Sequence, residues 1–101
     1  MNTYGLYAIY DTAAGCFQVP FVERNDGTAQ RAFATLANDP GSQIHHHAHQ
    51  FVLYKVGDFS EESGKIVSPK EPLSLGNALS MRKRGESRYP GEAGPREIEE
   101  I

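Results

Sequence analysis

The sequence has little of what several classes of protein require. It contains a single cysteine, Cys16, so no internal disulfide can form, and this fits a reducing cytosol. No apolar run approaches the roughly 18–20 residues of a membrane-spanning helix, and no signal peptide is visible. The glycines match neither the GxxxxGKS/T nor the GxGxxG pattern of phosphate-binding loops. The sequence therefore predicts neither a membrane protein nor a nucleotide-binding enzyme.

Charge is modest in total and unevenly distributed. The 101 residues carry a formal net charge of −3, with five basic and eight acidic side chains in residues 1–81 and five of each in residues 82–101. In the latter segment the basic side chains come first, at Arg82, Lys83, Arg84 and Arg88. From residue 85 onward glycine, proline and charge dominate and no core can be buried. We predict one domain over residues 1–81 and a charged, disordered tail over residues 82–101.

One short amphipathic helix is predicted at residues 24–38. Asn25 or Asp26 can cap its start, because a short side-chain oxygen accepts a hydrogen bond from the first turn. Asp39, Pro40 and Gly41 end it, since the residue before a proline is biased away from helical angles. One apolar face is predicted from Ala29, Ala32, Phe33, Leu36 and Ala37, with Gln30, Arg31, Thr35 and Asn38 on the other side.

Four strands are predicted around this helix, at residues 3–10, 16–22, 51–59 and 65–68. Pro20 lacks a backbone donor, which places the second strand at a sheet edge or ends it there. The fold class is therefore α+β, in the order ββαββ, with a small antiparallel sheet and one helix packed on a face. Residues 73–81 are compatible with one or two helical turns or with an extended segment.

Four histidines, His45, His46, His47 and His49, lie in a stretch that reads as a loop. Imidazole is the commonest metal ligand in proteins, and His45, His47 and His49 share one face of an extended chain. A structural zinc site needs four ligands, usually from two separated segments. Two hypotheses stay open: a solvent-facing loop that binds metals weakly, or a true metal site. We assign no metal and no cofactor.

An enzyme is not indicated. A catalytic thiol usually lies at a helix N-terminus or beside a fixed base, whereas Cys16 falls in a predicted strand just after a turn. A small, buried or half-buried cysteine is the simpler interpretation. Glu61 and Glu62 fall in a turn and are expected to be solvated.

Aromatic and basic side chains form the third group of interest. Tyr7, Tyr54 and Phe17 lie on predicted strands, and bases of single-stranded nucleic acid stack on such rings if the rings are exposed. The alternative is that these aromatics fill a small core. If DNA is the ligand, the phosphate contacts are predicted at Arg82, Lys83, Arg84, Arg88, Arg24 and Arg31.

Short pieces of this sequence, in a fixed order, resemble a viral family. The pieces are Leu6-Tyr7-Ala8-Ile9-Tyr10-Asp11, Pro20-Phe21, Arg24-Asn25-Asp26, Ala29, Arg31, Phe33, Asn38-Asp39-Pro40, Phe51, Leu53-Tyr54, Gly57-Asp58-Phe59 and Gly64. Their order and spacing over residues 6–67 resemble the small non-structural protein of gokushovirus-type Microviridae, often labelled a DNA-binding protein. The histidine run and the tail are not part of this resemblance.

The resemblance implies a non-enzymatic accessory protein of a single-stranded DNA phage, acting in the cytoplasm of the bacterial host. The implied partners are single-stranded DNA or viral or host proteins of replication and packaging, at the switch between the two. The alternative is a protein-interaction module, either a homo-oligomer or a domain that docks on a partner, with no direct DNA contact. Four short strands leave open edges, and a small core gains stability by pairing.

Overall fold

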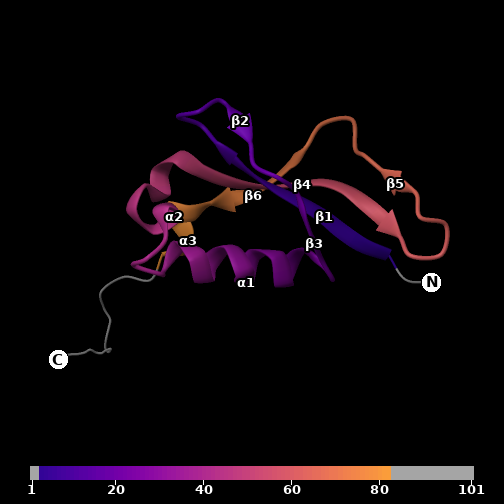
Figure 1. The fold of residues 1–101 in the computed structure, drawn as a ribbon, viewed down its shortest axis with the longest axis horizontal. Helices are drawn as coiled ribbons and strands as arrows, with labels where there is room; N and C mark the ends of the chain where they lie inside the picture. Colours follow the sequence, from indigo (N-terminus) through magenta and orange to yellow (C-terminus); the bar gives the residue numbers. More distant parts are fainter. Residues whose placement is uncertain (1–2, 83–101) are drawn as a thin grey trace.

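The computed structural model describes residues 3–82, which form an antiparallel sheet with a main helix along one face (Figure 1). The elements, in chain order, are β1 (Thr3–Asp11), β2 (Cys16–Phe17), β3 (Phe21–Glu23), α1 (Asp26–Ala37), α2 (Gln43–His46), the 3-10 helix η1 (Ala48–Gln50), β4 (Phe51–Ser60), β5 (Ile66–Val67), β6 (Leu73–Asn77) and α3 (Ala78–Met81). The predicted α+β class is confirmed. Of the predicted tail, only Arg82 falls within the described residues.

The sheet is built on the long pair β1 and β4, which are antiparallel from Thr3 opposite Ser60 to Asp11 opposite Phe51. On its other edge β1 pairs with β2 and β3, and β4 pairs with β5 and β6. Side chains alternate between the two faces of a strand, and opposite residues of an antiparallel pair share a face. A register shift after Leu6 separates the two halves of the β1–β4 pair.

Helix α1 begins with a capping box. The Asn25 side chain accepts a hydrogen bond from the Thr28 backbone N–H at 2.9 Å, and the Thr28 hydroxyl oxygen accepts one from the Asn25 N–H at 3.2 Å. Such an arrangement satisfies two backbone donors at the first turn and contributes about 1 kcal/mol. Of the two predicted caps, Asn25 and Asp26, the helix uses Asn25, and it runs from Asp26 to Ala37.

The core lies between α1 and the face of the sheet that carries Tyr7, Ile9 and Leu53. From the helix, the buried residues are Ala29, Phe33 and Ala37. They are spaced four residues apart and therefore form one narrow stripe. The predicted stripe was wider.

Leu36 is 38% exposed, and its place in the predicted apolar face is wrong. Gln30 and Asn38, predicted to face away, are part-buried and bond to β6 and α3. The Gln30 Nε2 donates to the Leu75 carbonyl at 3.3 Å, and the Asn38 Nδ2 donates to the Met81 carbonyl at 3.0 Å. The reason is that β6 and α3 return along this side of the helix.

Three other expectations change in detail. The predicted second strand, residues 16–22, is split into β2 and β3 around Pro20. Residues 73–81, for which two conformations were open, form strand β6 and one helical turn, α3. The histidine stretch is not a loop, because Ser42 caps a short helix by accepting a bond from the Ile44 N–H at 3.0 Å.

A polar contact closes the core at the start of α1. The Tyr7 side chain is fully buried, and its hydroxyl donates to the Asp26 Oδ1 at 2.6 Å. The Lys55 Nζ lies 3.1 Å from Asp58 and 3.7 Å from Asp26. A Cβ atom at Gly5 would collide with the Tyr7 ring, so glycine is needed there for the ring to reach α1.

We expect the Tyr7→Phe variant to lose about 1 kcal/mol of stability at neutral pH, because Asp26 loses its donor. Burial first, and then the hydrogen bond to Asp26, raise the pKa of Tyr7 well above its usual range. The phenol of the unfolded chain ionises near pH 10, so its contribution is complete below that pH and falls by about 1.4 kcal/mol per unit above it. Urea unfolding at pH 8 and 11 measures this.

The difference in stability between the wild type and Tyr7→Phe should thus shrink or reverse at pH 11. Tyr4→Phe is the control, since no hydrogen bond of the Tyr4 hydroxyl is recorded within residues 3–82. A difference that is the same at both pH values would show that the Tyr7 phenol ionises equally in the folded and unfolded chains.

Candidate nucleic-acid interface

The face of the sheet opposite α1 carries a cluster of three aromatic rings from three strands. Tyr10 of β1, Phe17 of β2 and Tyr54 of β4 are mutually in contact, and we call them the aromatic cluster. The ring centroids of Tyr10 and Phe17 are 4.7 Å apart, those of Phe17 and Tyr54 are 5.5 Å apart, and those of Tyr10 and Tyr54 are 6.3 Å apart. All three pairs are edge-to-face, a favourable geometry for aromatic rings.

The cluster is accessible. Phe17 is 42% exposed, and Tyr10 and Tyr54 are half-buried. Ala8 is the neighbour of Tyr54 across the strands and is buried on this face. No helix of the described residues covers these rings, so they offer an apolar surface to a ligand.

The rest of this face is uncharged and mostly apolar. By the register of the strands it holds Tyr4, Leu6, Ala8 and Tyr10 of β1, Phe17 of β2, Val22 of β3, Val52, Tyr54, Gly57 and Phe59 of β4, Ile66 of β5, and Ser74 and Asn77 of β6. We call this set the uncovered face. None of these residues is charged, although residues 1–81 have a net charge of −3. No acidic side chain of these strands therefore lies on this face, where it would repel a polyanion.

Of the three aromatic residues predicted to stack on bases, the structure brings two together. Phe17 and Tyr54 are in contact on the uncovered face. Tyr7 lies on the opposite face, in the core, and is fully buried. The prediction for Tyr7 is therefore wrong, because adjacent residues of β1 point to opposite sides and α1 covers the side of Tyr7. Tyr10, which is not one of those three, completes the cluster.

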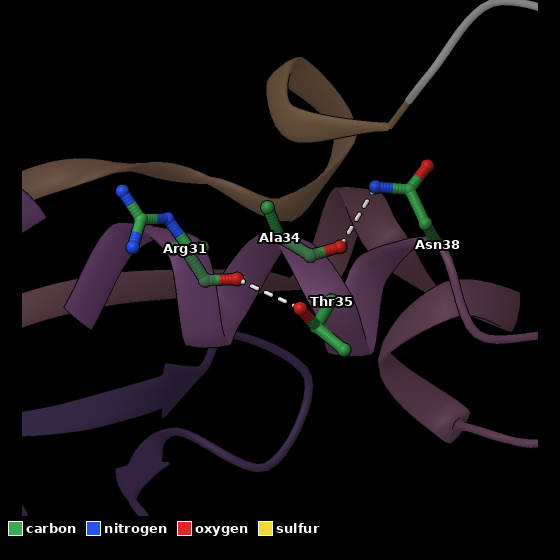
Figure 2. A pocket seen from close by; sticks show the side chains of 4 residues that line it. All are labelled: Arg31, Ala34, Thr35 and Asn38. Carbon is green, nitrogen blue, oxygen red and sulfur yellow. Dashed lines mark hydrogen bonds between the residues drawn. The ribbon is translucent and has the colours of Figure 1, made fainter. Parts of the chain in front are cut away.

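The predicted basic residues fall on different sides of the molecule. Arg24 is exposed at the end of β3, beside the uncovered face. Arg31 lies on α1, on the other side of the sheet, where Arg31, Ala34, Thr35 and Asn38 line a hollow (Figure 2). There the Thr35 hydroxyl donates to the Arg31 carbonyl at 3.0 Å, and the Asn38 Nδ2 donates to the Ala34 carbonyl at 2.7 Å. Arg31 therefore cannot act together with the aromatic cluster on one short strand.

Arg82 is exposed and follows α3 directly. Helix α3 comes after β6, whose Asn77 is opposite Val52, and Val52 is opposite Tyr10. The basic segment thus starts at the same end of the strands as the aromatic cluster, but on the α1 side of the sheet, because the Met81 carbonyl accepts a hydrogen bond from Asn38 at the end of α1. Lys83, Arg84 and Arg88, also predicted to bind phosphates, lie outside the described residues.

The histidines are partly used to hold the chain together. One ring nitrogen of His45 lies 2.8 Å from the Ala37 carbonyl, and one of His46 lies 2.6 Å from the Pro40 carbonyl. Each imidazole can donate to a carbonyl that the end of α1 or the following turn leaves without a partner. Within residues 3–82 no group of three or more His, Cys, Asp or Glu side chains is arranged to hold a metal ion, His45, His47 and His49 included.

Cys16 is exposed in β2, opposite Asp11. The expectation of a strand position is confirmed, whereas the expected burial is wrong. Strand β2 is only two residues long and lies at the edge of the sheet, so nothing in the described chain packs over the thiol.

The geometry defines a small α+β domain with an uncharged, aromatic sheet face that no helix covers. A family model described as phage ORF5 protein matches residues 4–81, and the chain belongs to this family. The match includes all of the sheet except Thr3 and extends through α3. No curated protein and no solved structure matches the chain. None of the helices within residues 3–82 is long and apolar enough to cross a membrane.

Proposed function

We propose that this phage protein binds single-stranded DNA on the uncovered face and acts by binding alone, without catalysis. Its setting would be the cytoplasm of a bacterium infected by a single-stranded DNA phage of the Microviridae, at the switch from genome replication to packaging. Membership of a phage family supports the viral setting. The resemblance of residues 6–67 to a small non-structural protein supports the finer assignment.

The observation that carries the proposal is the aromatic cluster. Tyr10, Phe17 and Tyr54 lie side by side on a surface without charge. Every base has an aromatic face, so such rings bind single strands with little regard to sequence, at about 1–3 kcal/mol per stacked base. Duplex DNA keeps its bases stacked inside and cannot use the rings in this way.

The phosphates need basic partners, and the candidates are Arg24 and the basic segment that begins at Arg82. Arg24 lies beside it at the β3 end. Arg82 lies at the end of the strands that holds the aromatic cluster, but on the α1 side of the sheet, so the basic segment must pass the edge of the sheet to meet a strand bound on the cluster. Lys83, Arg84 and Arg88 follow within six residues of sequence, a length of chain that spans at most about 20 Å when extended. We propose that this length brings the basic side chains around the edge of the sheet to a strand bound on the cluster.

The proposal predicts that the affinity for DNA falls as salt rises, and that the basic side chains of the tail cause part of this fall. The affinity for oligothymidine, measured by fluorescence anisotropy between 50 and 300 mM salt, should fall with a slope of about −0.7 per phosphate contacted. Replacing Arg82, Lys83, Arg84 and Arg88 together by alanine should make this slope less negative by roughly 2–3. Lys70→Ala, which removes an exposed charge beyond β5, is the control and should leave the slope nearly unchanged.

Two outcomes would contradict the proposed function or part of it. The absence of binding at 50 mM salt would exclude DNA as the ligand of this protein. An unchanged slope in the variant without the four tail charges would remove the tail from the mechanism.

The uncovered face also favours a second candidate function, a docking module that binds another protein or a second copy of itself. Val22 and Ile66 on this face are 50% and 56% exposed, and apolar surfaces of this kind mark protein interfaces. Light scattering over a range of concentrations separates the candidates. A tight oligomer that is indifferent to oligothymidine favours docking, whereas a monomer that binds DNA favours the first function.

A further inference from the structure

We propose that Tyr4, Val22 and Arg24 form a second nucleotide subsite, so that one single strand lies along β1 and is held at both ends. This inference rests on the proposed function and specifies where the strand runs and how long it must be. The aromatic cluster would hold one end of the strand, and the second subsite would hold the other.

The second subsite is a pocket of about 250 Å³ lined by Tyr4, Val22, Glu23 and Arg24. Tyr4 is opposite Phe59 and Val22 is opposite Leu6, which places both on the uncovered face. The pocket therefore opens beside the same surface as the aromatic cluster, but at the opposite end of β1. Its size suits one base or sugar, with the Tyr4 ring as the stacking surface and Val22 as an apolar contact.

Glu23 also lines the pocket, but its side chain belongs to the other face of the sheet. Glu23 is opposite Gly5, on the face covered by α1, and its charge contributes to the raised pKa of the buried Tyr7. Because side chains alternate along β3, Val22 lies toward the pocket and the Glu23 carboxylate lies on the far side of the strand. A phosphate beside Arg24 would thus not face the Glu23 carboxylate directly.

Arg24 is available for a phosphate. It is exposed, and within residues 3–82 it makes no ion pair, whereas Lys55 is held between Asp26 and Asp58. The planar guanidinium can bind phosphate oxygens through two parallel hydrogen bonds. Arg24 therefore has the role expected of a phosphate anchor, next to a ring that can stack on the attached base.

The distance between the two subsites sets a length for the ligand. Tyr4 and Tyr10 are six residues apart on β1, and a strand rises about 3.3 Å per residue, so the subsites are roughly 20 Å apart. A stacked single strand advances about 3.4 Å per nucleotide, so roughly six nucleotides are needed to reach both. The surface between them holds Leu6, Ala8 and Gly57, without a charge that would repel the backbone.

The test is the affinity of the full chain for oligothymidines of three to twelve nucleotides at a fixed, low salt concentration. The wild type should show a rise of at least about fivefold between three and eight nucleotides, as the second subsite becomes occupied. The Tyr4→Ala and Arg24→Ala variants should bind the three-nucleotide ligand within twofold of the wild type and lose most of that rise.

Arg31→Ala is the matched control, because it removes the same charge from the other side of the sheet, and it should behave as the wild type. Circular dichroism checks that each variant is folded, and Arg24 is exposed enough for its replacement to leave the fold intact. If Arg24→Ala and Arg31→Ala have equal effects at every length while binding persists, the second subsite is overturned and the proposed function stands. If the wild type binds no oligothymidine at any length, both the second subsite and the proposed function are contradicted.

Discussion

Replacing Phe33 by alanine is expected to lower the free energy of unfolding by about 3–5 kcal/mol. Phe33 is 1% exposed and lies at the middle of the narrow stripe by which α1 packs on the sheet. Its neighbours on the stripe, Ala29 and Ala37, are too small to fill the cavity that the ring would leave. Domains of this size are stable by only about 5–15 kcal/mol, so the variant should unfold at a much lower urea concentration.

Leu36→Ala is the matched control. It removes an apolar side chain from the same helix, but one that is 38% exposed, and the expected loss is below about 1.5 kcal/mol. Urea unfolding followed by circular dichroism measures both variants. Equal losses would contradict the account of the core, because they would mean that α1 is held by its whole apolar side and not by the narrow stripe.

The main helix and the long strands could be predicted because their signals are local. Asn25 and Thr28 form the cap, Pro40 follows the end, and the apolar residues between them repeat with the helical period. The width of the buried stripe could not be predicted, because it depends on what packs beside the helix. Strand β6 and α3 come from more than 35 residues away and bond to Gln30 and Asn38.

Strand β6 itself gave no clear signal. It is five residues long, only Leu73 and Leu75 are apolar, and Gly76 has a positive φ of 118°, a conformation that most residues avoid. Its partner, β4, starts the pairing from Val52. A segment this short becomes a strand because a long neighbour offers unpaired backbone groups, which is a property of the fold and not of the segment.

The sequence predicts a loop for the histidine stretch for a related reason. Four helical residues are too few to show a period, so the signal was the cap at Ser42, three residues after Asp39. The ring contacts of His45 and His46 with the Ala37 and Pro40 carbonyls depend on the tight turn between the two helices. A count of histidines cannot distinguish such structural rings from metal ligands.

Only part of the candidate site could be predicted from the sequence. Phe17 and Tyr54 were candidates for stacking, but β1 is apolar on both faces, so alternation alone did not show whether Tyr7 or Tyr10 would be covered by the helix. One local feature separates them in retrospect. Gly5 lies two residues before Tyr7, on the same face, and leaves the space that the Tyr7 ring needs to reach Asp26.

The central claim is that DNA meets the aromatic cluster, and the Phe17→Ala/Tyr54→Ala double variant tests it. Each stacked base contributes about 1–3 kcal/mol, so loss of both rings should weaken binding of an eight-nucleotide oligothymidine by at least about 30-fold. A Leu36→Ala/Leu79→Ala double variant is the control. It removes two exposed apolar side chains from α1 and α3, on the helical side of the molecule, and should bind as the wild type.

The most direct measurement is therefore the affinity of the two double variants at low salt, each shown to be folded by circular dichroism. We expect the Phe17→Ala/Tyr54→Ala protein to lose nearly all binding while the control retains it. A folded Phe17→Ala/Tyr54→Ala protein with wild-type affinity would contradict the account, because the DNA would then be held by charge alone and the uncovered face would have another purpose.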